Sequence, residues 1–142
     1  MKLWKSNREG IQGRPIHSEI ERRKLSAMII AIAGPWIERL GPDPPLPAVE
    51  FAYQTCGAVW NASRLEDATA REEIVCELRE GVISAAPKGT ETEVRQLFDM
   101  LYERALAAWP TDRRMVANLA VVDLGRGSFR VDVASVAGGS EA

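Results

Sequence analysis

The hydrophobic period changes in the last third of this 142-residue chain. Between residues 94 and 109 apolar side chains recur every three or four positions, which predicts an amphipathic helix. Between residues 119 and 133 they alternate on both sides of Gly125-Arg126-Gly127, which predicts a β-hairpin with its turn at the glycines. Because an isolated two-stranded hairpin is only marginally stable in water, it must pack on helices of the same chain or pair with a strand from another chain.

A two-residue turn at Arg126-Gly127 defines the two faces of the expected hairpin. It pairs Leu124 with Phe129, and it puts Asp123 opposite Arg130 on the other face. An opposite-charge pair at such cross-strand positions is favourable and supports this register. The apolar face expected to pack on the helices consists of Val122, Leu124, Phe129, Val131 and Val133.

In this register Leu119 and Val121 lie on the face turned away from the helices. Unpaired strand edges can recruit a strand from another chain. We therefore expect these two side chains and the free edges of the hairpin to be open to a partner.

Four helices are expected, at about residues 18–40, 47–64, 67–85 and 91–109. The first begins at Ser18, with Glu21 three residues later as in a capping box. Gly34-Pro35 should kink or end it, because proline lacks the backbone donor and crowds the carbonyl group of residue 31. Ile30 and Ile37 fall opposite the main apolar stripe of this helix, so we expect an exposed apolar side there.

The second helix is apolar or small except along one thin polar stripe, which predicts a central position in the fold. The stripe contains Glu50, Gln54, Asn61 and Arg64. Amphipathic helices usually show such a stripe to water, which favours a surface position. The alternative is a cleft lined by these four side chains, which would bind a polar ligand.

The third helix should pack through Ile74, Val75, Leu78 and Val82, with its glutamates facing solvent. The two cysteines, Cys56 and Cys76, lie on helical patterns beside apolar neighbours. Both are therefore expected to be buried, reduced thiols, which favours a cytoplasmic protein.

The overall net charge of −2 gives no general attraction to nucleic acid or to an anionic membrane. Residues 1–24, however, carry seven lysines and arginines against three glutamates, a net charge of +4. Trp4 and the run Arg22, Arg23 and Lys24 are therefore candidate contacts for a partner protein or for nucleic acid. No stretch is long and apolar enough for stable membrane insertion.

The inventory of reactive side chains argues against several chemistries. One histidine, His17, and two separated cysteines do not supply the local ligand spacing of a zinc site. No glycine-rich nucleotide-binding motif is present. We predict no catalytic residue, metal or other cofactor.

The expected fold is α+β and mainly α: four or five helices in a bundle-like layer with a C-terminal two-stranded antiparallel hairpin. The domain should span residues 17–136, between a flexible basic arm at 1–16 and a disordered tail at 137–142. The function expected is that of a non-enzymatic protein–protein interaction module, an adaptor or regulatory subunit, binding another protein or a second copy. The alternatives are nucleic-acid binding through the basic arm and a small enzyme or ligand-binding protein with a cleft at Glu50.

Overall fold

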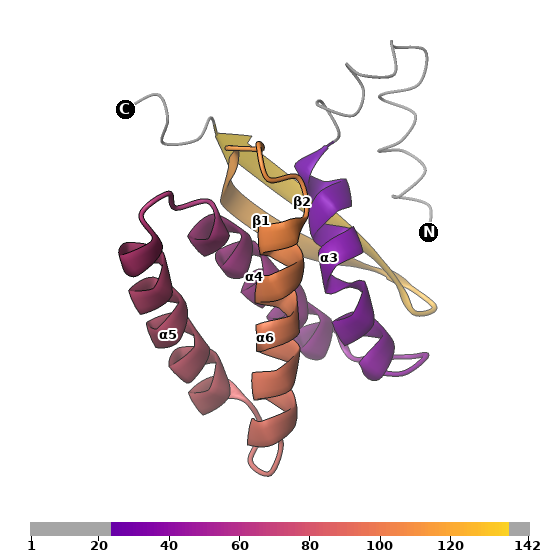
Figure 1. Cartoon of the computed structure of the whole chain (residues 1–142). Helices are drawn as coiled ribbons and strands as arrows, with labels where there is room; N and C mark the ends of the chain where they lie inside the picture. The colour runs from indigo at the N-terminus through magenta and orange to yellow at the C-terminus, as the bar shows by residue number, and fades with distance from the viewer. Residues whose placement is uncertain (1–23, 137–142) are drawn as a thin grey trace, which may run out of the picture.

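A computed structural model describes residues 24–136 and shows an α+β, mainly α fold, as predicted (Figure 1). Its elements are α3 (Leu25–Arg39), α4 (Leu46–Ser63), α5 (Ala68–Ala85), α6 (Glu91–Ala107), β1 (Met115–Gly125) and β2 (Ser128–Val136). The predictions for the arm at 1–16, the helix start at Ser18 and the tail at 137–142 lie outside the described residues. Among the described helices, none is both long and apolar enough to cross a membrane.

Helix α3 runs through Pro35 to Arg39, so of the two predicted effects of the proline, a kink or an end, the end does not occur. Pro35 has no N–H for the carbonyl group of Ala31, one turn earlier. Arg104 of α6 donates to that carbonyl at 2.8 Å and to the carbonyl of Ile32 at 3.1 Å. A side chain from another helix thus satisfies the acceptor that the proline leaves unpaired.

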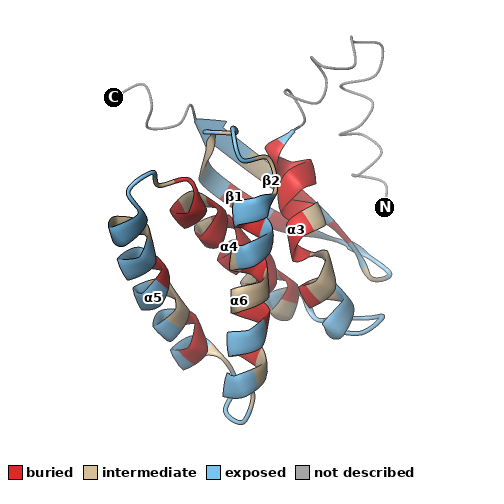
Figure 2. Ribbon diagram, in the orientation of Figure 1, coloured by how far each residue is buried: buried red, intermediate tan, exposed pale blue. Residues whose placement is uncertain are grey.

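Helix α4 occupies the centre of the fold, as its narrow polar stripe predicts, and is buried along most of its length (Figure 2). It packs against α3, α5, α6 and β1, and the core that they form also takes in side chains of β2. The largest fully buried side chains of that core are Trp60, Phe98, Met28, Ile29, Ile32 and Leu101. Ile30 also belongs to this core with 8% exposure, so the exposed apolar side predicted for the first helix is not present there. Ile37 is partly buried against the same core.

The hairpin turns at Arg126 and Gly127, whose φ angles of 58° and 75° suit a type I′ turn. Its register differs from the prediction because Leu124 has no partner on β2: Asp123 pairs with Phe129, and Gly125 with Ser128. This one-residue bulge shifts residues 118–123 by one position, and a second irregularity between Val116 and Asn118 shifts Met115 and Val116 by one more. The Asp123 carboxylate accepts a hydrogen bond from the Gly125 N–H at 2.8 Å, which stabilises the bulge.

Over residues 118–123 this shift exchanges the two faces of β1. Leu119 and Val121, predicted to be open, are buried at 6% and 8% exposure, opposite Val133 and Val131. Leu124, predicted to be buried, is 47% exposed. The predicted opposition of Asp123 and Arg130 does not form either; Arg130 instead pairs with Asp132 on its own strand at 3.2 Å.

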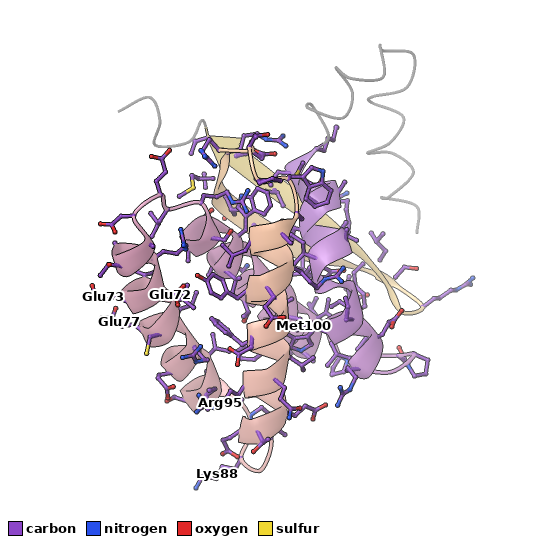
Figure 3. The ribbon with its side chains drawn as sticks, viewed as in Figure 1. Glu72, Glu73, Glu77, Lys88, Arg95 and Met100 are labelled. Carbon is purple, nitrogen blue, oxygen red and sulfur yellow. The ribbon has the colours of Figure 1, made fainter. Side chains whose placement is uncertain are left out.

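Helix α5 stands at the edge of the helical layer and buries only a narrow face (Figure 2). Val75, Val82 and Ile83 are its buried residues. Ile74 is 45% exposed and Cys76 is exposed, contrary to the predictions for both. No described element covers the outer side of this helix, from which the Glu73 and Glu77 side chains also point outward (Figure 3).

Candidate functional site

The polar stripe of α4 docks the hairpin instead of lining a cleft. The Asn61 amide forms two hydrogen bonds with the backbone of Val116, accepting from its N–H at 2.7 Å and donating to its carbonyl at 3.0 Å. Gln54 donates to the carbonyl of Leu119 at 2.8 Å. Gly57 lies between them on the helix, where a Cβ atom would come within 3.2 Å of the Leu119 Cδ1 atom.

Arg64, the last residue of that stripe, organises the loop between α6 and β1. Its guanidinium stacks 4.1 Å above the Trp60 ring and donates to the carbonyls of Ala105, Trp109 and Asp112, the last two at 2.9 and 3.1 Å. Burial lowers the pKa of Arg64, while the nearby Asp112 carboxylate acts in the opposite direction. Every one of these contacts is internal, so Arg64 supports the fold.

Glu50, the remaining residue of the predicted cleft, is half-buried and takes part in none of these contacts. The stripe therefore holds the hairpin through Gln54 and Asn61 and the loop between α6 and β1 through Arg64. The structure thus gives no support to a polar active site at these positions.

Cys56 is buried, as predicted, and its thiol contacts the Ile29 carbonyl at 3.6 Å. Burial raises the pKa of this thiol well above its usual range. A thiol that stays protonated is a poor nucleophile, so Cys56 acts as a core residue.

The described part of the chain also has an apolar groove of about 530 Å³ that the sequence did not reveal. One wall comes from the end of α3 and the start of α4, where Trp36 and Phe51 meet edge to face with ring centroids 5.9 Å apart. The other wall comes from the connection between α5 and α6 and from the first turns of α6. The apolar lining residues are Trp36, Leu40, Pro45, Pro47, Ala48, Phe51, Ala85, Pro87, Val94 and Leu97.

The rim of this groove carries one ion pair, in which Arg39 of α3 contacts Glu93 of α6. Both side chains are about half exposed, at 56% and 44%. Thr90 is the other polar lining residue, and its hydroxyl already donates to the Pro87 carbonyl at 2.5 Å. The polar groups of the groove are thus largely paired with each other, and its floor is apolar.

The only local signal for this groove is the proline-rich connector at residues 42–47, which contributes Pro45 and Pro47 to its lining. Of the residues expected to contact a partner, Lys24 is exposed, whereas Trp4, Arg22 and Arg23 lie outside the described residues. Lys24 is not among the residues that line the groove.

Comparison with known proteins adds no relative: no protein-family model, no curated protein and no solved structure matches this chain.

Proposed function

We propose that this chain is a protein-interaction module whose apolar groove binds a helical segment of a partner protein. The observation that carries the proposal is the groove itself, which has Trp36 and Phe51 in one wall and Val94 and Leu97 in the other. Exposed apolar surface costs free energy in water, and a contiguous apolar depression is typical of a binding surface.

The chemistry of the lining favours an apolar segment over a polar metabolite. Sites for small polar molecules usually present several converging polar groups that orient the ligand. Here Arg39 and Glu93 are paired with each other, and Thr90 is bonded to Pro87. A helix that inserts two or three apolar side chains at i, i+3 or i+4, and i+7 would cover the floor without leaving polar groups unpaired.

The charge of the domain favours a partner segment that is basic along its flanks. Residues 24–136 carry 12 lysines and arginines against 16 aspartates and glutamates, a net charge of −4. Attraction between unlike charges speeds association and orients the partner. The same acidic charge weakens the alternative of nucleic-acid binding by this part of the chain, and that alternative rests on residues 1–24 alone.

The test is a display selection in which the full-length chain selects helical peptides from a random library. We expect the enriched peptides to be amphipathic, with an apolar face and a net positive charge. Ala48 lines the groove and is half-buried, so Ala48→Arg should place a long charged side chain in it and weaken binding of the selected peptides at least about tenfold. Ala107→Arg is the matched control, because Ala107 is exposed at the other end of α6.

A synthetic peptide of residues 1–24 is a second ligand in the same assay, since it combines a net positive charge with Trp4. Binding of this peptide that is lost in Ala48→Arg would identify a second copy or the chain's own arm as the occupant in place of a partner protein. The interaction proposal fails if no peptide is enriched, or if the two arginine variants bind the enriched peptides equally well.

A further inference from the structure

A second pocket, of about 330 Å³, lies where the loop between α4 and α5 meets the end of α6 and the loop that follows it. Both loops are at the end of the helical layer opposite to the connection between α5 and α6 (Figure 1). The pocket is therefore remote from the apolar groove, which that connection helps to line. Three arginines line it, Arg64, Arg71 and Arg113, together with one carboxylate, that of Glu66.

Two of these arginines keep N–H groups for a ligand. Arg71 donates through Nε to the Tyr102 hydroxyl at 3.2 Å and through Nη1 to the Leu65 carbonyl at 2.9 Å. Arg113 donates through Nη1 to the Pro110 carbonyl at 3.0 Å. The Nη2 group of each arginine has no hydrogen-bond partner within the described part of the chain. These bonds hold one side of each guanidinium in place and leave its other N–H groups open to an anion.

The third arginine, Arg64, is a buried positive charge in the wall of the pocket, with only 7% exposure. Its bonds to Ser63, Ala105, Trp109 and Asp112 take four of the five guanidinium N–H groups. Burial lowers the pKa of Arg64, the Asp112 carboxylate raises it, and the positive charge of Arg113 lowers it again. Arg64 and Arg113 thus lie close enough to repel each other, and an anion between them would relieve that repulsion.

The acidic side chains at this end of the domain compete only weakly for the lining arginines. The Glu66 side chain is 75% exposed, and its Oε2 atom lies 3.6 Å from Arg113 Nε, which is too long for a hydrogen bond. The Asp112 carboxylate is bound by Arg114 at 2.6 Å. Three arginines against one carboxylate leave the lining with a net charge of +2.

A net charge of +2 matches a dianion. A phosphate monoester carries nearly two negative charges at neutral pH, and it has three terminal oxygens, one for each guanidinium. A carboxylate or a phosphodiester carries a single charge and has two free oxygens. The remaining lining includes Leu106, which is 37% exposed, and Pro110, which offer apolar contact to the esterified group.

We propose that this pocket binds a phosphate monoester group, with Arg64, Arg71 and Arg113 facing its terminal oxygens. The group can belong to a small molecule or to a phosphorylated side chain of a partner protein. The site is independent of the apolar groove, so it stands or falls separately from the binding of a helical segment there.

The test is calorimetric titration of the full-length chain at pH 7.5 and constant ionic strength with three ligands that share a phenyl ring: phenyl phosphate, phenylacetate and methyl phenyl phosphate. Phenyl phosphate should bind at least about tenfold more tightly than the carboxylate or the diester. A neutral peptide with one phosphoserine distinguishes the two sources. Tighter binding of the peptide than of phenyl phosphate would assign the group to a phosphorylated partner protein, and weaker binding would assign it to a small molecule.

Three variants test the roles of the charged residues. Arg71→Gln and Arg113→Gln should each weaken binding of phenyl phosphate by about fivefold to tenfold. Arg113 is 42% exposed, so Arg113→Gln should leave the melting temperature nearly unchanged and is the variant to rely on if Arg71→Gln is unstable. Glu66→Gln should strengthen binding by about twofold to threefold, because it removes a like charge from the pocket.

Arg95→Gln is the matched control. Arg95 is exposed to a similar extent, 48%, forms one ion pair with Glu80 at 3.3 Å, and lies near the connection between α5 and α6, away from the pocket (Figure 3). The proposal is overturned if Arg95→Gln weakens binding as much as Arg113→Gln, which would show general charge attraction. Equally tight binding of phenylacetate or methyl phenyl phosphate, or weaker binding by Glu66→Gln, would overturn it as well.

Discussion

The guanidinium of Arg104 lies 2.8 Å from the carbonyl oxygen of Ala31, the acceptor that Pro35 deprives of its usual helical donor. The arginine and the proline are therefore energetically coupled although they lie on different helices. Arg104→Met should lower the free energy of unfolding by about 1–2 kcal/mol, because it removes two hydrogen bonds from a charged group that is itself exposed.

The coupling is measured by repeating that substitution in a Pro35→Ala background, with urea denaturation of all four chains. Alanine at position 35 supplies the missing N–H to Ala31, so the cost of Arg104→Met should fall by at least about 0.5 kcal/mol. Equal costs in the two backgrounds would mean that Arg104 stabilises α3 independently of the proline.

Asn61 should be the most sensitive residue of the contact between α4 and the hairpin. Asn61→Ala leaves the N–H and carbonyl groups of Val116 without their present partner and should cost about 2–3 kcal/mol of unfolding free energy. Gln54→Ala, which removes one hydrogen bond from an exposed side chain, should cost less than about 1 kcal/mol. Chemical denaturation of the two variants gives both losses of unfolding free energy. A larger loss for Asn61→Ala than for Gln54→Ala would show that the two hydrogen bonds of Asn61 contribute more to stability than the single one of Gln54.

Gly57 and Gly81 should respond oppositely to alanine. A Cβ atom at Gly81 meets nothing within 4 Å, so Gly81→Ala should stabilise the chain by about 0.5–1 kcal/mol through helix propensity. At Gly57 the same atom would come within 3.2 Å of the buried Leu119 side chain, so Gly57→Ala should destabilise or at best be neutral. Melting temperatures of the two variants test this. Equal stabilisation of both would show that β1 can move away from the added Cβ atom at position 57 at little cost in free energy.

Asp112 should make stability depend on pH in the acid range. Burial acts to raise the pKa of its carboxyl group, but the hydrogen bonds from Arg114 outweigh burial and hold that pKa below its ordinary value. The resulting stabilisation is fully present above the ordinary aspartate pKa, about 3.9, and is lost as the pH falls through the lower pKa of the folded state.

Asp112→Asn should therefore lower the unfolding free energy by about 1–2 kcal/mol at pH 7 and by less at an acid pH below the folded-state pKa, where the native carboxyl group is protonated. Denaturation curves of both chains at the two pH values provide the measurement. Asp123→Asn serves as a control for general charge effects, because Asp123 is exposed and accepts only from the Gly125 N–H. A loss that is equal at both pH values would assign the effect to something other than ionisation.

Local patterns predicted most of the elements, because helix periodicity and turn residues act over a few positions. The hairpin turn was predictable because two-residue turns need positive φ angles, which glycine adopts easily. Arg126 and Gly127 have such angles in the structure. The bulge at Leu124 is different, because it depends on which face of β1 fits against α4. The Leu119 side chain lies against Gly57, and the Asn61 amide pairs with Val116, and neither relation is visible within the strand itself.

The apolar groove escaped prediction for a similar reason. Trp36 and Phe51 read as core residues in their own helices, and only the relative placement of α3, α4 and α6 leaves a groove beside them. The polar stripe of α4 was correctly located, but its role depended on the position of β1.

The pairing of Asn61 with Val116 also makes the two edges of the sheet unequal in their ability to accept another strand. A helix side chain occupies backbone groups of β1 that an added strand would need, so β1 is capped along this stretch much as a third strand would cap it. Any strand that extends the sheet, from a partner or in an aggregate, must therefore join at β2. Substitutions at Asn61 would free the backbone groups of Val116 on that edge, while the Gln54 bond to the Leu119 carbonyl would still occupy part of it.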